Sequence, residues 1–106
     1  MDRYAKQRIF LGAEREARLR SKRVAIVGLG ATGSVIAAWL ARAGVGHLTL
    51  LDRDIVETTN LQRQLLYGES DVLRPKAQAA AARMREANSG VELRPVVADL
   101  TGGNAR

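Results

Sequence analysis

The sequence has no cysteine, four aromatic residues and two prolines among its 106 residues. Without cysteine it has no disulfide, no zinc site built on thiolates and no cysteine nucleophile. It also has no stretch of about 20 consecutive apolar residues, which a membrane-spanning helix requires, and its charged start is unlike a signal peptide. We therefore expect a cytoplasmic protein that does not contact membranes.

The net charge of +6, from 17 Lys and Arg against 11 Asp and Glu, is compatible with nucleic acids or with phosphorylated ligands as partners. However, the arginines are spread from Arg3 to Arg106 without a long basic run, and four aromatic residues offer few rings for base stacking. We therefore expect no nucleic-acid partner and interpret most of the charge as a solvated surface. The length suits one small domain with a single core.

Residues 23–54 read as strand, glycine turn, helix and strand. The run Val24–Val27 is apolar and β-branched, as in a strand covered on both faces. A helix is predicted over Ser34–Ala43, with Gly44 as its stop, and a second strand over His47–Leu51. The apolar face predicted for this helix comprises Val35, Ile36, Trp39, Leu40 and Ala43.

Gly28, Gly30 and Gly33 have the spacing G-x-G-x-x-G. The first glycine permits a tight turn, the second lets the backbone approach a phosphate, and the third lets the helix pack on the strand. A phosphate would then lie at the N-terminus of the helix, where unpaired N–H groups and the helix dipole favour an anion. Asp52 ends the second strand nineteen residues after Gly33, where a carboxylate can accept both ribose hydroxyls. An ordinary tight turn is the alternative, but it leaves Asp52 without a role.

The flanking segments complete an α/β fold. Residues 1–22 favour helix and are interpreted as an N-terminal arm. A third strand is predicted over Val91–Val97, where Pro95 suggests an edge position. Together these elements predict a Rossmann-like parallel sheet, in the strand order 3-2-1 with flanking helices, that is truncated after three strands. Residues 23–106 would then form the nucleotide-binding part.

The segment that follows Asp52 carries a polar pattern. Asn60 is predicted to N-cap a short helix, on which Leu61 and Leu65 point one way. Arg63 and Gln64 would form a polar face with Asn60, because these residues are three and four positions apart. A surface turn explains the pattern equally well.

A second helix is predicted to begin at Pro75, a favourable first position. Lys76 then lies in its first turn, where a cation opposes the helix dipole by about 0.3–1 kcal/mol. A nearby phosphate would reverse that cost. Chance placement of a lysine on an exposed helix end is the alternative.

In order and spacing, several motifs resemble the adenylation domain of the ubiquitin-activating superfamily, in particular the bacterial adenylyltransferases that act on sulfur-carrier proteins for thiamine thiazole and molybdopterin synthesis. The resemblance covers residues 3–101 and rests on Arg3-Tyr4-Ala5-Lys6-Gln7, Gly28–Gly33, Ala43-Gly44-Val45-Gly46, Leu51-Asp52-Arg53-Asp54, Asn60–Gln64 and Pro75-Lys76. It implies that ATP lies over the glycine turn. The C-terminal glycine carboxylate of a ubiquitin-like protein would attack the α-phosphate, giving an acyl-adenylate and pyrophosphate.

The resemblance also implies roles for individual residues. Asp52 would hold the ribose, and Asp54 would help a metal ion, hold Arg63 or serve as a structural turn carboxylate. Four residues would contact the phosphates: Asn60, Arg63, Gln64 and Lys76. Of these, Arg63 and Lys76 would be the catalytic cations.

Lys6 departs from the family pattern, because it stands where an arginine usually reaches the ATP of the partner subunit in a homodimer. The resemblance places the aspartate that binds Mg²⁺ and the substrate groove beyond residue 106, so no metal ligand is expected within the chain. The chain therefore looks like the N-terminal half of the domain, and we expect no adenylation by residues 1–106 alone.

Two other functions stay open. The first is an NAD-binding fragment of an oxidoreductase, because G-x-G-x-x-G with a ribose acid also serves dinucleotides. The polar residues Asn60–Gln64 and the cation Lys76 speak against it. The second is a catalytically inactive interaction module, which the missing metal aspartate favours, although truncation explains that absence as well.

Overall fold

The computed structural model describes residues 2–105. Three parallel strands, β1 (Arg23–Val27), β2 (His47–Leu51) and β3 (Glu92–Val96), form one sheet in the order β1-β2-β3. This confirms the predicted Rossmann-like sheet with the second strand in the centre. The helices are α1 (Ala5–Leu11), α2 (Ala13–Ser21), α3 (Ala31–Ala43) and α4 (Lys76–Ala87), with two short 3₁₀ turns, η1 (Thr58–Asn60) and η2 (Glu69–Asp71).

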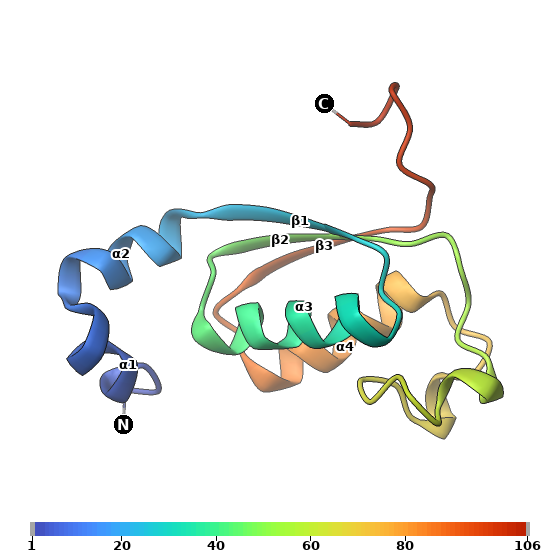
Figure 1. The fold of residues 1–106 in the computed structure, drawn as a ribbon, viewed down its shortest axis with the longest axis horizontal. Coiled ribbons are helices and arrows are strands. Elements are labelled where there is room, and N and C mark those ends of the chain that lie inside the picture. Colours follow the sequence, from blue (N-terminus) through green and yellow to red (C-terminus); the bar gives the residue numbers. More distant parts are fainter. Residues whose placement is uncertain (1, 106) are drawn as a thin grey trace.

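Helices α3 and α4 both lie on one face of the sheet, and they contact each other (Figure 1). The core lies between them and the strands. It includes Ile26, Leu48, Leu50 and Leu93 from the sheet, Ala37 and Ala41 from α3, and Ala77, Ala80, Ala81 and Met84 from α4. Because alanine is small, both helices approach the sheet closely. Because the strands are parallel, each helix between them runs back along the sheet. The carboxyl ends of the strands and the N-termini of α3 and α4 therefore lie at the same end of the molecule (Figure 1).

Among the described residues, no helix packs on the opposite face of the sheet (Figure 1), although Leu51 at the end of β2 is buried there. Along β1, Ile26 is buried and Val24 is partly buried, whereas Ala25 is exposed and Val27 is 53% exposed. The prediction of a first strand covered on both faces is therefore wrong for this part of the chain. A run of four apolar residues indicates a strand, but it does not determine how many layers pack against it.

The predicted apolar face of α3 is wrong at Ile36 and Trp39, whereas Leu40 packs against the core as predicted. Its buried residues are Ser34, Ala37 and Ala41, while Ile36 is 48% exposed and Trp39 is 72% exposed. The buried residues are three and four positions apart and form one stripe, so the helix does pack with the expected period. The small side chains face the sheet because the helix lies close to it, and Ile36 and Trp39 project away.

The N-terminal arm, α1 and α2, docks at the end of the sheet opposite to the start of α3 (Figure 1). The hydroxyl of Tyr4 accepts a hydrogen bond from Asn88 Nδ2 at 2.6 Å, and Gln7 Nε2 donates to the carbonyl of Ala43 at 2.8 Å. The guanidinium of Arg20 lies 3.5 Å from the centroid of the Tyr4 ring. These contacts attach the arm to the C-terminal ends of α3 and α4.

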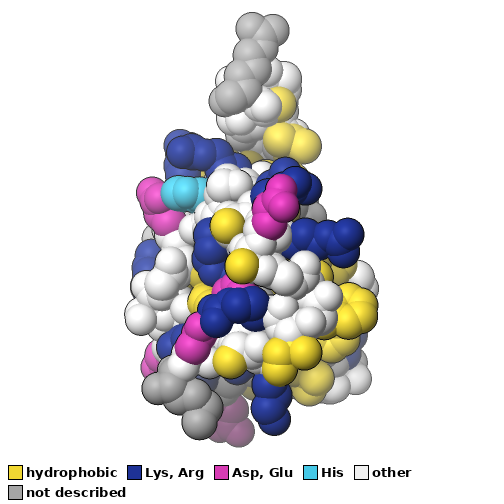
Figure 2. Space-filling model, turned by 90° about the vertical axis from the view of Figure 1, so that its left-hand side faces the viewer, with side chains coloured by type: hydrophobic (Ala, Val, Ile, Leu, Met, Phe, Trp, Pro, Cys, Tyr) yellow, Lys and Arg dark blue, Asp and Glu magenta, His cyan; other side chains and the backbone are white. Residues whose placement is uncertain are grey.

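On the face at the arm end of the molecule, Lys and Arg side chains are dispersed among acidic ones (Figure 2). The single histidine, His47, has its Nδ1 2.7 Å from Glu92 Oε2. This distribution agrees with the interpretation of the charge as a solvated surface. None of the helices in residues 2–105 has the length and apolarity needed to cross a membrane.

Asp71 connects the loop before α4 to the helix itself. Its Oδ2 accepts hydrogen bonds from the N–H of Gly68 at 2.8 Å and from Nη2 of Arg83 at 2.9 Å. Its Oδ1 lies 3.4 Å from Nη1 of Arg74. Burial acts to raise the pKa of this carboxyl, but the Gly68 N–H and the two guanidinium groups outweigh it. The pKa of Asp71 therefore lies below its ordinary value of 3.8.

We expect Asp71 to contribute to the acid sensitivity of folding. Because its pKa is lower in the folded state, the stabilisation is complete above the ordinary value of 3.8 and is lost as the pH falls through the folded-state pKa. Asp71→Asn should lower the free energy of unfolding at pH 7 by about 1–3 kcal/mol and should reduce the further loss on acidification. Urea unfolding followed by circular dichroism from pH 7 to pH 3 measures both effects, with exposed Glu69→Gln as the control. The same acid dependence in Asp71→Asn and the unsubstituted chain would contradict this account.

Candidate nucleotide site

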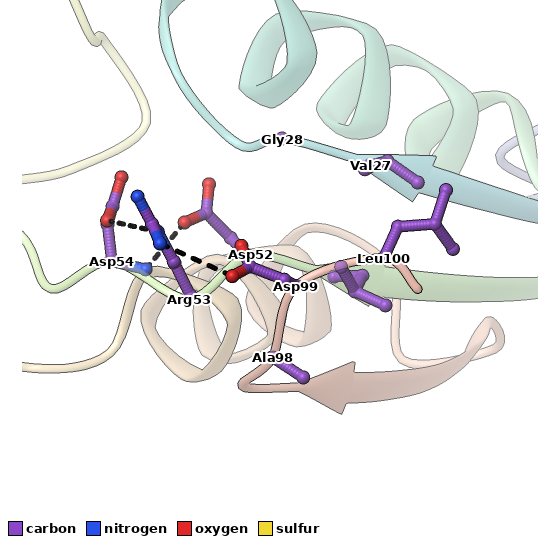
Figure 3. Close-up of a pocket in the computed structure, with 9 residues that line it drawn as sticks. Val27, Gly28, Asp52, Arg53, Asp54, Ala98, Asp99 and Leu100 are labelled. Atoms are coloured by element: carbon purple, nitrogen blue, oxygen red, sulfur yellow. Dashed lines mark hydrogen bonds and ion pairs between the residues drawn. The ribbon is translucent and has the colours of Figure 1, made fainter. Parts of the chain in front are cut away.

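A pocket of about 200 Å³ opens at the carboxyl ends of the strands (Figure 3). It is lined by Val27, Gly28, Leu51, Asp52, Arg53, Asp54, Ala98, Asp99 and Leu100. In open parallel α/β sheets, ligands bind at this edge. The sequence segments expected to bind a nucleotide, the glycine turn and Asp52, meet here.

The three glycines of the turn meet different backbone requirements. Gly28 has a φ of +88°, which residues with a side chain rarely adopt. A Cβ atom on Gly33 would lie 1.8 Å from the carbonyl oxygen of Gly28, so only glycine allows this approach of α3 to the turn. In the part of the chain that the structure describes, a Cβ on Gly30 would meet only Nε2 of Gln64, at 3.9 Å. The space beside Gly30 is therefore open, as phosphate binding would require.

The N-terminus of α3 has no side-chain cap. The helix begins at Ala31, three residues before the predicted start at Ser34, and Gly30 occupies the N-cap position. The first helical hydrogen bond runs from Ser34 N–H to the carbonyl of Gly30 at 3.1 Å, so the N–H groups of residues 31–33 have no helical acceptor. Ala31 and Thr32 are exposed. The positive end of the helix dipole thus faces open space beside the pocket.

Asp52 connects the end of β2 to the glycine turn. The residue is only 9% exposed, and its Oδ2 accepts the N–H of Leu29 at 2.7 Å while its Oδ1 accepts the N–H of Asp54 at 2.7 Å. Two backbone groups therefore fix the orientation of the carboxylate. Each carboxylate oxygen has a second lone pair, so the group still has acceptor capacity for ribose hydroxyls.

Asp54 is exposed on the rim of the pocket. Its carboxylate lies 3.8 Å from Nε of Arg53, whose Nη1 lies 3.3 Å from Asp99 Oδ2 (Figure 3). Among the described residues Asp54 thus pairs with the neighbouring Arg53, while Arg63 hydrogen-bonds Thr59. The backbone carbonyl of Asp54 accepts the N–H of Lys76 at 2.9 Å, which fixes the start of α4 beside the end of β2.

The helix predicted to begin at Asn60 does not form. The 3₁₀ turn η1 ends at Asn60, and Glu57 is its N-cap; Asn60 Oδ1 accepts the N–H of Glu57 at 2.8 Å. Leu61 packs against the core, whereas Leu65 is 83% exposed, so the two leucines do not share a face. The chain makes successive turns here instead of a regular helix, and helical spacing therefore does not apply.

Gln64 is the residue of this segment that reaches the glycine turn. It is 4% exposed, its Nε2 is the atom nearest to the open space at Gly30, and its Oε1 has no hydrogen-bond partner among the described residues. A buried amide oxygen without a partner is costly. Arg63 is different: it is exposed, and its Nη1 hydrogen-bonds the carbonyl of Thr59 at 3.1 Å. The structure does not bring the Arg63 side chain into contact with the turn.

Lys76 is the first residue of α4 and is only 6% exposed. The interpretation of this lysine as a chance placement on an exposed helix end is therefore wrong. Ile55 and Pro75 form an antiparallel bridge, which pairs the chain after β2 with the start of α4. Lys76 follows this bridge directly and lies in the interior. Within residues 2–105 the ammonium has no acidic partner, although it lies in a first turn where a cation is unfavourable.

Tyr67 is the site residue that the sequence patterns missed. It is 5% exposed, and its hydroxyl donates a hydrogen bond to the carbonyl of Leu29 in the glycine turn at 2.7 Å. Burial, followed by the charges of Asp52 and Asp71, raises the pKa of this hydroxyl well above its usual range. It is one of only four aromatic residues in the chain, but its spacing from the turn gives no further signal.

The described residues do not by themselves fit a magnesium site. Between residues 2 and 105, no three side chains of His, Asp or Glu are grouped so that they could hold a metal ion. The oxygens of Asp52 already accept backbone N–H groups, and Asp54 and Asp99 both lie near Arg53.

Comparisons with known proteins show what this chain is similar to. The model of the ThiF family matches residues 4–106. The sulfur carrier protein ThiS adenylyltransferase of Bacillus subtilis is 45% identical over 106 residues, which cover 96% of this chain and 32% of that protein. The molybdopterin-synthase adenylyltransferase of Escherichia coli is 42% identical, over 94% of this chain and 41% of that protein.

A solved structure extends the comparison to the fold. The E. coli tRNA N6-threonylcarbamoyladenosine dehydratase, solved in complex with ATP, superposes with a TM-score of 0.90 at 31% identity, over 96% of this chain and 42% of that one. The chain thus spans about a third of the B. subtilis relative and less than half of the other two proteins.

Proposed function

Because the chain belongs to the ThiF family, we propose that it binds ATP at the glycine turn and forms the nucleotide-binding part of an adenylyltransferase. One observation carries this proposal: the uncapped N-terminus of α3 opens beside Gly30. Among residues 2–105, the one side-chain atom near this opening belongs to the buried amide of Gln64, whose oxygen has no hydrogen-bond partner there. Such an N-terminus favours a phosphate. The ATP complex of the E. coli structural relative supports the choice of nucleotide.

In the proposed complex, Gly28, Gly30 and Gly33 shape the backbone for the phosphates and Asp52 accepts the ribose hydroxyls. The remaining polar residues, Asn60, Arg63, Gln64 and Lys76, would contact the phosphates, and Asp54 would line the rim. Arg63 would have to leave its bond to Thr59 to do so. Lys76 needs no such change, because no acidic group holds its ammonium among the described residues.

The proposed reaction is the activation of a carboxylate. The C-terminal glycine carboxylate of a ubiquitin-like sulfur carrier would attack the α-phosphorus of ATP, forming a P–O bond while the bond to the β-phosphate breaks and pyrophosphate leaves. Such transfers depend mainly on positioning and on neutralising charge, which the α3 N-terminus and Lys76 would supply here. Magnesium would neutralise further phosphate charge when it is bound, but no step is assigned to it because the described residues form no site for it.

The partner and the assembly belong to the same proposal. We propose a homodimer in which the exposed Lys6, on the arm at the far end of the sheet, serves the site of the partner subunit. The arm of residues 1–22 would then act in the partner's site, and residues 23–106 would bind the nucleotide. We also propose a cytoplasmic location for the enzyme.

Titration with ATP and with NAD, each in buffer containing magnesium, tests the proposed function. The chain should bind ATP about tenfold or more tightly than NAD, because Lys76 and the α3 N-terminus favour a high density of phosphate charge. Isothermal titration calorimetry gives both dissociation constants. Equal or tighter binding of NAD would favour the oxidoreductase alternative.

A further inference from the structure

Buried side chains hold both backbone polar groups of Leu29 in the glycine turn. Its N–H donates to Asp52 Oδ2 at 2.7 Å, and its carbonyl accepts from the hydroxyl of Tyr67 at 2.7 Å. Leu29 is fully buried, so neither group exchanges its partner for bulk water. One residue earlier, the N–H of Gly28 donates to the carbonyl of Leu51 at 2.9 Å. Three backbone groups of Gly28 and Leu29 are therefore fixed immediately before Gly30.

The hydrogen bond from Tyr67 has a consequence for Gly30. The carbonyl of Leu29 and the N–H of Gly30 belong to the same peptide, and in a planar trans peptide the two groups point in opposite directions. The direction of the carbonyl therefore sets the direction of the N–H. Gly30, on the C-terminal side of this peptide, has no side chain to restrict its φ, so the orientation of the peptide depends more on such a contact. The N–H of Gly30 has no acceptor among the described residues.

We propose that Tyr67 is a positioning residue for phosphate binding: its hydroxyl fixes the Leu29–Gly30 peptide and so presents the N–H of Gly30 to a phosphate. This inference rests on the proposed nucleotide site and adds a residue that lies outside the set expected from the sequence. The raised pKa of the Tyr67 hydroxyl is consistent with it, because a protonated hydroxyl remains a donor throughout the neutral pH range.

The variant Tyr67→Phe tests this assignment, because it keeps the buried ring and removes only the hydroxyl. In magnesium-containing buffer, ATP should bind about five- to tenfold more weakly to this variant than to the unsubstituted chain, while adenosine binding changes less than about twofold. Tyr4→Phe is the matched control. It removes a hydroxyl that is also hydrogen-bonded, to Asn88 at 2.6 Å, but at the opposite end of the sheet. It should leave both affinities unchanged.

A second measurement follows the Gly30 amide directly by ¹H–¹⁵N NMR. In the unsubstituted chain, the Gly30 amide resonance should shift on addition of ATP. In Tyr67→Phe this shift should be smaller, while the rest of the spectrum remains that of a folded protein. Unchanged ATP affinity, or equal losses for ATP and adenosine, would overturn the assignment. A Tyr67→Phe chain that no longer folds would show that the hydroxyl is required for folding and would overturn it too. If the unsubstituted chain binds ATP no better than adenosine, the proposed function itself fails, and this inference fails with it.

Discussion

Replacement of Lys76 by methionine is expected to weaken ATP binding about 10- to 100-fold, which is the range for losing a charged hydrogen-bond donor. Adenosine binding should change less than about twofold, because adenosine has no phosphate. Methionine keeps an unbranched side chain for the buried position, where Lys76 is 6% exposed. The fold should therefore be retained, and removing a cation from the first turn of α4 should relieve an unfavourable dipole interaction of about 0.3–1 kcal/mol.

Weaker ATP binding together with retained stability would distinguish a binding role of Lys76 from a structural one. Calorimetric titration measures the two affinities, and urea unfolding measures stability. Lys22→Met is the control, because it removes an exposed lysine at the C-terminal end of α2. A variant Lys76→Met that binds ATP normally and unfolds more easily would identify the lysine as a structural residue and contradict its assignment to the phosphates.

Replacement of Asp52 by alanine should weaken ATP and adenosine together, each by about 100-fold, because both ligands contain the ribose that the carboxylate is proposed to accept. Part of this loss would come from the glycine turn. The carboxylate of Asp52 holds the N–H of Leu29 at 2.7 Å, so its removal also leaves a buried donor unpaired. We therefore expect a lower melting temperature together with the loss of both ligands.

Asp99→Ala is the matched control for Asp52→Ala. Asp99 lines the same pocket, but its side chain is 60% exposed and pairs with Arg53 on the rim (Figure 3). Removal of the Asp99 carboxylate should change the affinity for ATP or for adenosine by less than about threefold, as expected for an exposed ion pair. Titrations of ATP and adenosine against both variants make the comparison. Selective loss of ATP but not adenosine in Asp52→Ala would refute the ribose assignment.

The sequence predicted the sheet and the glycine turn because their determinants are local. The apolar run of β1, Gly28 at a positive φ and Gly33 against the Gly28 carbonyl all act within a few residues. The face of α3 was predicted wrongly for a different reason. Periodicity indicates that one stripe is buried, but the choice between Ala37 and Trp39 depends on how closely the helix lies on the sheet.

The site beyond the turn depends on contacts between distant segments. Lys76 is buried where the chain around Ile55 pairs with the chain around Pro75, two segments about 20 residues apart. The hydrogen bond from Tyr67 to Leu29 spans 38 residues, and no spacing rule predicts it. The segment around Asn60 forms turns held by local hydrogen bonds, from the N–H of Glu57 to Asn60 and from Arg63 to Thr59. The polar pattern therefore identified the segment, but the helix expected to carry it does not form.

The binding of ATP at the uncapped N-terminus of α3 is the central claim. The most direct test is to add ATP, and separately adenosine, to the ¹⁵N-labelled chain and to follow every backbone amide. We predict that ATP, much more than adenosine, shifts the amides of Gly30, Ala31 and Thr32, while both ligands shift those near Asp52. Shifts confined to the helix-free face of the sheet, around Ala25 and Thr49, or identical shifts with both ligands at residues 30–32, would contradict the claim.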